Sequence, residues 1–294
     1  MKQLIVLLSV ACAVAAYAGI TRDDVAETRY TALARQKQFD CVGQVLKGKE
    51  AIGSCVLIDK KYVLTAAHIF IESSERPDTT ITDGQNLILY VPYNEHVGNI
   101  RNYYFHINGK KYRGKSLKIF PTYGDSATAG TCDLAVVELA DEVKGISPAV
   151  INTAFNELGA NVVGVGFGAS GIAGKPSTVK FRNKKIAGEN IIDSLAGYEL
   201  NGVSTLLQCD FDHPTNAECN QMGTALPRPL EYICTGGDSG GGLFRQTVNG
   251  WELVGICSGS AVNIDRLMKT GYYGQVMSWT RVSVFNDWIF ENFR

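Results

Sequence analysis

The sequence of 294 residues lacks the features that mark metalloproteins, nucleic-acid-binding proteins and membrane proteins. It has only four histidines, and no Cys-x-x-Cys or His-rich spacing typical of zinc sites. Its formal net charge is −1, which predicts neither a nucleic-acid partner nor binding to an anionic membrane. It also lacks an internal repeat, a Pro/Gly/Ser-rich linker and a second long apolar run. We therefore expect no metal, no organic cofactor and no membrane attachment.

The one long apolar run lies at the start of the chain. Lys2 is followed by the apolar residues 4–16, and Ala16-Tyr17-Ala18 has the small-x-small pattern of a cleavage site. The run is short for a membrane span. Residues 1–18 are therefore predicted to be a secretory signal peptide. The mature chain is expected to be secreted, into the extracellular space or the periplasm.

Removal of residues 1–18 would take away Cys12 and leave seven cysteines. An exported chain with this many cysteines is expected to contain disulfides, although an odd number leaves at least one unpaired. Cys209 and Cys219 are close enough in sequence to close a loop, but the connectivity stays open. The seven are Cys41, Cys55, Cys132, Cys209, Cys219, Cys234 and Cys257.

The most unusual stretch runs from 234 to 244 and contains five glycines within seven positions. Glycine is used where the backbone takes positive φ or approaches another group closely. The glycines surround Asp238 and Ser239, and a tight loop can direct consecutive N–H groups into one small space, as in an oxyanion hole. Ser239 is therefore a candidate nucleophile. The alternative is a Gly-rich hairpin turn with an incidental serine.

A serine nucleophile needs a base, and no histidine follows Ser239. This order excludes the α/β-hydrolase interpretation of Gly237–Gly241, because that fold places its histidine after the serine. His68 follows an apolar run at 55–64 that is predicted to be a strand. The strand would place His68 at its end, and the small alanines beside it would leave room around the imidazole ring. The other histidines lie in polar surroundings and are interpreted as surface or turn residues: His96, His106 and His213.

The third member of such a site is a carboxylate that orients the base. Asp133 stands directly before the apolar run 134–139, which reads as a core strand. Alone, such an aspartate would usually be a strand-edge cap. Together with the other two candidates, it gives the chain order His68, Asp133, Ser239.

Three motifs in this order resemble those of the chymotrypsin-like (trypsin-like) serine peptidase family: TAAH at 65–68, DLAVVEL at 133–139 and GDSGG at 237–241. Later stretches agree with the resemblance, which covers roughly residues 40–294. Trp251–Ser258 is similar to the family's W-x-LVGI-x-S strand, and 280–289 to its closing strand and helix. Thr21–Asp24 and Asp210–Asp212 look most like secreted bacterial-type members.

The resemblance implies an all-β fold of two antiparallel six-stranded β-barrels packed together, with a C-terminal helix. Residues 19–39 would form an N-terminal segment, and 40–294 the peptidase domain. Barrel one is expected over about 40–155, barrel two over about 156–283, and the helix over about 284–293. Glu72–Gln85 is expected to be a polar loop, and 201–230 a long irregular approach to the nucleophile.

The resemblance also implies the chemistry. Ser239 would be the nucleophile, His68 the general base and Asp133 the group that orients it. The N–H groups of Gly237 and Ser239 would form the oxyanion hole, and Ser258 would support Asp133. The substrate would be a protein or peptide, and a monomer is expected. An inactive protease-like binding or regulatory module is the alternative, with an esterase on the same fold less favoured.

Two departures from the family affect specificity and activation. The substrate pocket aligns with Tyr232 or Ile233 at its base and with Gly259–Ser260 along its wall, so no acid is present to bind a cationic P1 side chain. Only Asp265 could reverse that expectation. No basic residue precedes an Ile-Val-like pair, so the partner of Asp238 is open: a terminus at Gly19 or Ile20 after signal cleavage, or else a side chain.

Overall fold

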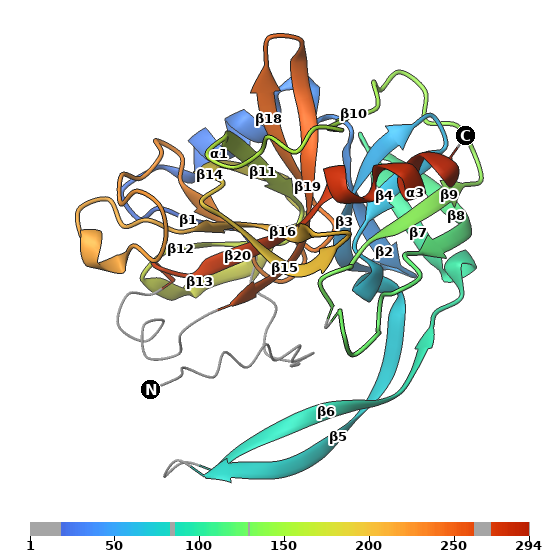
Figure 1. Ribbon diagram of the computed structural model, residues 1–294, viewed down its shortest axis with the longest axis horizontal. Helices are drawn as coiled ribbons and strands as arrows, with labels where there is room; N and C mark the ends of the chain where they lie inside the picture. Colours follow the sequence, from blue (N-terminus) through green and yellow to red (C-terminus); the bar gives the residue numbers. More distant parts are fainter. Residues whose placement is uncertain (1–18, 83–85, 129, 262–271, 294) are drawn as a thin grey trace.

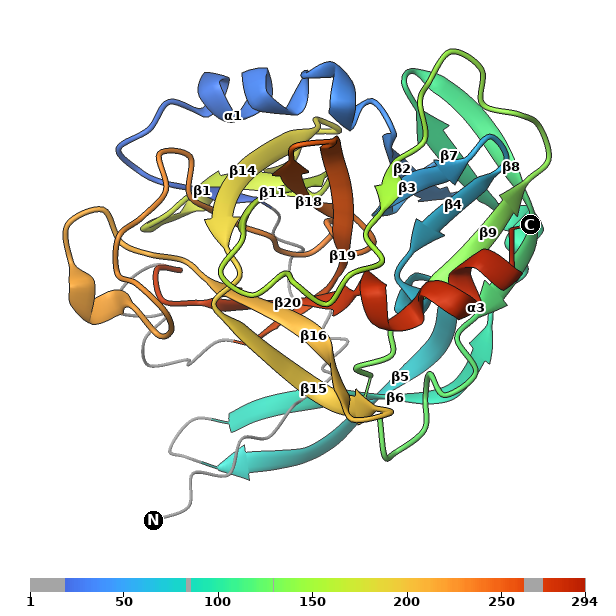
Figure 2. The ribbon, with the colours of Figure 1, turned by 45° about the horizontal axis from the view of Figure 1, so that its top comes forward.

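The computed structural model describes residues 19–82, 86–128, 130–261 and 272–293. Strands dominate, and two β units pack side by side (Figures 1 and 2). The C-terminal helix α3 (Asn286–Glu291) lies along the first unit, where Trp288 packs edge-on against Phe120. The expected mostly-β fold with a C-terminal helix is confirmed.

The first unit is a closed six-stranded barrel, as expected. Its strands are antiparallel, and β4 pairs with β9 so that Thr65 faces Ala135. This register brings the residues after β4 and those before β9 to one end of the barrel. The ring runs β2 (Val42–Lys47), β3 (Glu50–Asp59), β4 (Tyr62–Thr65), β9 (Ala135–Leu139), β8 (Lys110–Ile119) and β7 (Tyr103–Ile107).

The second unit is a strongly curved sheet whose hydrogen bonding forms an open path, not the closed ring of a barrel. Among the described strands, β16 pairs with β20 on one side and with β15 on the other. β14, at the other end of the path, pairs within this sheet with β11. The path runs β14 (Ile186–Ile191), β11 (Asn161–Gly166), β18 (Gly242–Thr247), β19 (Gly250–Ala261), β20 (Val276–Arg281), β16 (Val203–Asp210) and β15 (Ser194–Leu200), with β10 (Val150–Ile151) beside β19.

The N-terminal segment is part of this second unit. β1 (Ile20–Thr21) lies between β12 (Ala169–Ile172) and β17 (Tyr232–Ile233), and β13 (Lys175–Phe181) completes a four-stranded sheet. Ile20 is fully buried. The chain then forms α1 (Glu27–Ala34), which packs on β14 (Figure 2). The residues just after the expected signal peptide are therefore built into the fold.

The expectation of a polar loop over 72–85 is wrong. β5 (Ile71–Thr82) and β6 (Asn86–Val97) form a long antiparallel hairpin that projects from the first barrel (Figure 1). β6 pairs antiparallel with β5 from Ile71–Val97 to Thr82–Asn86. It supplies the backbone partner that turns the preceding polar segment into a strand.

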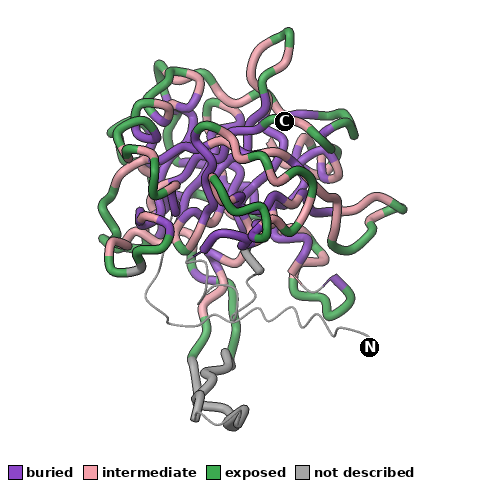
Figure 3. Tube along the Cα trace, turned by 90° about the vertical axis from the view of Figure 1, so that its left-hand side faces the viewer, coloured by how far each residue is buried: buried purple, intermediate pink, exposed green. Residues whose placement is uncertain are grey.

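Short 3₁₀ turns connect the strands, and buried segments run through the interior of the molecule (Figure 3). The buried residues form two clusters: one fills the first barrel and continues into the second unit at Phe244 and Ile256, and the other lies within the second unit. The irregular segment expected over 201–230 is wrong for 203–210, which form β16, whereas 211–231 have little regular structure besides η4 (Ala217–Cys219) and lead to the nucleophile loop. The turns are η1 (Lys37–Phe39), η2 (Ala67–Phe70), η3 (Ile100–Asn102), η4 (Ala217–Cys219) and η5 (Val282–Phe285).

A buried ionic network holds the crossing between the units. Glu157, fully buried, accepts a hydrogen bond from Arg281 at 2.7 Å and another from Ser283 at 2.5 Å. Asn152 donates to the same carboxylate at 3.0 Å and accepts from Arg245 at 2.9 Å. The connecting segment is thereby tied to the second unit by charge-assisted hydrogen bonds.

Two further expectations concern the described residues. No helix among them is long and apolar enough to cross a membrane. All seven described cysteines are buried, and the expected disulfides stay a prediction.

Candidate active site

The centre of the candidate site is the pair formed by His68 and Asp133. His68 lies in η2 directly after β4, and Asp133 lies just before β9, so the barrel register brings them together. The ring Nδ1 is 2.6 Å from Asp133 Oδ2, and the backbone N–H of His68 donates to Oδ1 at 2.9 Å. One carboxylate thus fixes both the ring and its backbone, and leaves Nε2 as the nitrogen able to accept a proton.

The second unit contributes to the same carboxylate. Ser258, on β19, donates its hydroxyl to Asp133 Oδ2 at 2.8 Å. Thr280, on β20, donates to the backbone carbonyl of Asp133 at 3.0 Å. The Asp133 side chain is only 4% exposed, so these contacts act in a largely water-free environment. Three of the predicted site residues, His68, Asp133 and Ser258, are therefore brought into direct contact.

The environment of His68 determines when its ring is neutral. Burial lowers the pKa of His68, but the charge of Asp133 and its hydrogen bond to the ring together raise this pKa above its ordinary value. The side chain is still 38% exposed, so its free edge is open to a reacting group. A raised pKa makes His68 a stronger base, but one that is neutral only at higher pH.

The nucleophile loop approaches the first barrel closely. Gly237 and Gly240 have φ of +90° and +82°, which other residues rarely adopt. A Cβ on Gly240 would collide with the Thr65 side chain and the backbone of Ser54. The backbone N–H of Ser54 donates to the carbonyl of Ser239 at 2.7 Å. The loop therefore needs glycine in order to bring Ser239 beside the end of β4.

Ser239 itself is partly exposed. Within the described residues, its hydroxyl is not hydrogen-bonded to His68. Such bonds are often long in free enzymes and tighten when substrate binds. Gly240, next to Ser239, contacts Thr65 and Ala66, which immediately precede the η2 turn that carries His68. The predicted nucleophile and the predicted base thus lie at the same end of the first barrel.

Asp238, next to Ser239, is almost completely buried and accepts four hydrogen bonds. The donors are the N–H groups of Gly19 (2.9 Å), Gly168 (2.9 Å) and Thr235 (3.3 Å), and the hydroxyl of Tyr232 (3.0 Å). Burial raises the pKa of Asp238, and these hydrogen bonds oppose that rise. Among the described residues no side-chain cation pairs with it. Of the partners that the sequence left open for Asp238, the structure places Gly19 beside the carboxylate, whereas the Tyr232 contact was not expected.

The residues predicted to form the substrate pocket lie on two strands, Tyr232 and Ile233 on β17 and Gly259 and Ser260 on β19. Tyr232 is buried against Gly188 with its hydroxyl on Asp238, and Ile233 pairs with Ile20. Both residues pair with β1 of the N-terminal segment. Gly259 is exposed, with open space where a Cβ would lie. Ser260 pairs with Met277 through its backbone, whereas its side chain and Asp265 lie outside the described part of the chain.

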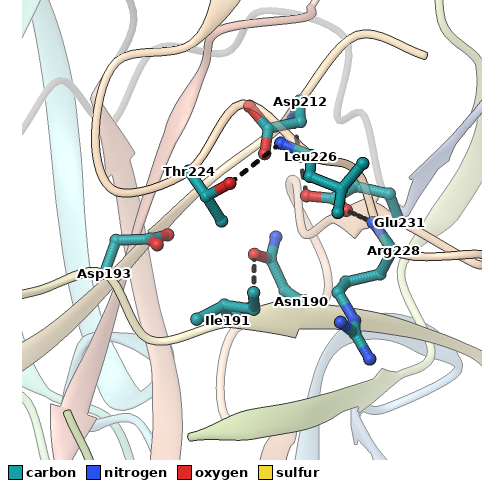
Figure 4. Close-up of a pocket in the computed structure, with 8 residues that line it drawn as sticks. All are labelled: Asn190, Ile191, Asp193, Asp212, Thr224, Leu226, Arg228 and Glu231. Carbon is teal, nitrogen blue, oxygen red and sulfur yellow. Dashed lines mark hydrogen bonds between the residues drawn. The ribbon is translucent and has the colours of Figure 1, made fainter. Parts of the chain in front are cut away.

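A separate acidic pocket lies beside the segment that leads to the nucleophile loop (Figure 4). Burial, reinforced by neighbouring carboxylates, raises the pKa of Asp193 and of Asp212 to about 7 and that of Glu231 to about 8. Asp212 is 5% exposed, and its Oδ1 has no hydrogen-bond partner. No three described His, Cys, Asp or Glu side chains are placed to hold a metal.

The barrel, the His68–Asp133 pair and the glycine loop define the class of chymotrypsin-like serine peptidases. The family model described as Trypsin matches residues 31–289, and the chain belongs to this family. The fold is similar to that of neuropsin, a serine protease expressed in the limbic system of mouse brain. The TM-score is 0.55 at 16% identity, with 93% of this chain and 99% of that chain covered. No curated protein matches the chain.

The raised pKa of His68 predicts how peptide hydrolysis responds to pH. Hydrolysis requires the neutral ring, so kcat/KM should rise with pH through an ionisation above about 6.5 and be lost as pH falls below it. In Asp133→Asn this ionisation should move to lower pH, because burial then acts without the opposing carboxylate. The rate should also fall by about 10⁴. The exposed Asp141→Asn is the control. An unmoved profile in Asp133→Asn would contradict the assignment.

The raised pKa values in the acidic pocket predict that its carboxyl groups stabilise the fold more at low pH than at neutral pH. A carboxyl group with a raised folded-state pKa stabilises the fold fully below its unfolded value of about 3.9. For Asp212 this contribution is lost as pH rises through about 7. Melting temperatures measured between pH 4 and pH 9 should therefore fall less steeply in Asp212→Asn than in the wild type. Asp141→Asn should keep the wild-type slope. Parallel curves for all three proteins would show that the pocket does not govern this behaviour.

Proposed function

We propose that the chain is a secreted serine endopeptidase that acts through His68, Asp133 and Ser239. The observation that carries the proposal is the pair of hydrogen bonds that Asp133 accepts from the ring and the backbone N–H of His68, at the same barrel end as Ser239. This arrangement fixes the tautomer in which Nε2 can accept a proton. The trypsin family implies protein or peptide substrates.

In the proposed reaction, the hydroxyl oxygen of Ser239 attacks the scissile carbonyl carbon while His68 Nε2 takes the hydroxyl proton. Asp133 stabilises the resulting imidazolium, and the N–H groups of Gly237 and Ser239 stabilise the oxyanion. His68 then gives its proton to the leaving amine, and an acyl-enzyme remains. Water, deprotonated by His68, attacks the ester and restores Ser239. The reaction needs no group beyond these residues and water.

The three residues should act as one unit. Ser239→Ala and His68→Ala should each lower kcat by about 10⁴–10⁶ without unfolding the protein, and the double variant should be little worse than either single variant. Steady-state kinetics on a peptide substrate, with circular dichroism to check the fold, would measure this. The exposed His96→Ala should retain full activity. Additive losses, or normal hydrolysis by Ser239→Ala, would favour the inactive binding module.

We further propose that removal of residues 1–18 creates the competent N-terminus. The backbone nitrogen of Gly19 already lies 2.9 Å from Asp238, which is buried without a described cation. Cleavage before Gly19 would convert that amide into an ammonium group and pair the buried charge, which an isolated carboxylate requires. The fully buried Ile20 beside it would keep the new terminus in place.

Protein that begins at Gly19 should therefore hydrolyse peptides without any further cleavage. N-terminal sequencing of active material secreted by the producing cells should give Gly19 as the first residue. One extra residue before Gly19, or the change Asp238→Asn, should reduce kcat strongly, whereas Asp24→Asn at the surface should not. Activity that appears only after a cut between residues 20 and 50 would refute the proposal.

For specificity, we propose an uncharged P1 residue. A cationic P1 side chain needs a counter-charge, and the buried Tyr232 and Ile233 supply none. Asp238, which accepts a hydrogen bond from Tyr232, is also engaged by Gly19 and Gly168. Cleavage of a peptide library should show no preference for Arg or Lys at P1. A strong Arg or Lys preference that disappears in Asp265→Asn would overturn the proposal and assign the counter-charge to Asp265.

A further inference from the structure

The side chain of Ser54 lies between the two β units, at the nucleophile loop. Ser54 is on β3 of the first barrel and is completely buried. Its hydroxyl donates to the carbonyl of Gly237 at 3.1 Å and accepts from the N–H of Phe167 at 2.9 Å. The hydroxyl therefore uses its single donor and bridges two segments of the second unit that are about 70 residues apart in sequence.

The backbone of the same residue also holds the loop. The N–H of Ser54 donates to the carbonyl of Ser239 at 2.7 Å, and its carbonyl accepts from the Thr65 hydroxyl at 2.7 Å. Ser54 thus contacts both residues whose N–H groups are the proposed oxyanion donors, Gly237 and Ser239. In each case Ser54 donates to the carbonyl oxygen of the residue. That carbonyl belongs to the peptide unit after the one that contains the N–H group of the oxyanion hole.

Gly237 needs such a constraint more than other residues. Its φ of +90° lies in a region where glycine rotates freely, and glycine flanks it at 236. The following peptide unit is held at one end by the Ser54 hydroxyl on the Gly237 carbonyl. At its other end the N–H of Asp238 donates to Thr235 at 3.1 Å. Without the hydroxyl, the Gly237 carbonyl and the Phe167 N–H would both lose this partner in a part-buried place.

We propose that the hydroxyl of Ser54 is a positioning element for the oxyanion hole: it fixes the peptide at Gly237 so that the loop is preorganised before substrate arrives. This inference rests on the proposed peptidase function. Preorganised donors stabilise the charge that develops in the transition state more than they stabilise bound substrate. The hydroxyl should therefore affect kcat and not KM.

The test compares Ser54→Ala with wild type on a peptide substrate. Small displacements of catalytic groups cost about a hundredfold, so kcat should fall by about tenfold to a hundredfold, with KM changed by less than about twofold. Affinity for a peptidyl trifluoromethyl ketone, whose adduct carries an oxyanion, should fall by a similar factor. Binding of an unreactive peptide should not change. Ser54→Cys keeps the shape with a poor hydrogen-bonding group and should give the same pattern.

The matched control is Ser170→Ala, because Ser170 is equally buried on β12 but its hydroxyl has no partner. It should retain the wild-type kcat. If Ser54→Ala and Ser54→Cys both keep kcat within twofold, or lose affinity for the ketone and the unreactive peptide equally, the positioning role is wrong. If the wild type itself hydrolyses no peptide, the proposed function fails instead, so the two failures are distinguishable.

Discussion

The carboxylate of Asp133 is the interaction on which the arrangement of the site depends. It accepts hydrogen bonds from the ring and the backbone N–H of His68 in the first barrel and from the hydroxyl of Ser258 in the second unit. Thr280 holds its backbone from β20. Because the residue is buried, each of these hydrogen bonds acts at low effective dielectric, where a lost partner is costly. One side chain therefore orients the candidate base and joins the two halves of the molecule.

The nucleophile loop shows a second constraint, the need for backbone to approach backbone. Gly240 lies against Thr65 and Ser54, and Gly241 lies against the carbonyl of Val165. A Cβ at Gly240 would push the loop away from the barrel that carries His68, and one at Gly241 would push it away from β11 of the second unit. The same closeness lets Ser54 reach the loop with both its backbone and its hydroxyl. The two units thus meet through hydrogen bonds that only a glycine-rich loop permits.

Local motifs were enough to predict much of the fold and the candidate site. His68, Asp133 and Ser258 each stand at a recognisable point of a strand, and the register of β4 with β9 brings the first two together. The mostly-β fold, the first barrel and the C-terminal helix followed from the same motifs. The open path of the second sheet was not predicted. The motifs do not determine that β15 takes the place beside β16 at the end of that path.

Contacts between distant segments could not be predicted. The sequence left the partner of Asp238 open between Gly19, Ile20 and a side chain, and a tyrosine at 232 fits a pocket floor as well as it fits a hydrogen-bond donor. Ser54 is an ordinary serine in a strand until the loop lies against it. The hairpin β5–β6 was missed because its first strand is polar and takes its structure from backbone pairing. In each case the deciding neighbour is remote in sequence or has no side-chain signature.

The central claim is that His68 and Asp133 activate Ser239 as a nucleophile. Reaction of the folded protein with a fluorophosphonate, followed by intact mass measurement and peptide mapping, tests this most directly. We expect one adduct per chain, on Ser239, formed rapidly in the wild type and very slowly in His68→Ala. A chain that stays unlabelled, carries the adduct on another serine, or reacts equally fast without His68 would contradict it.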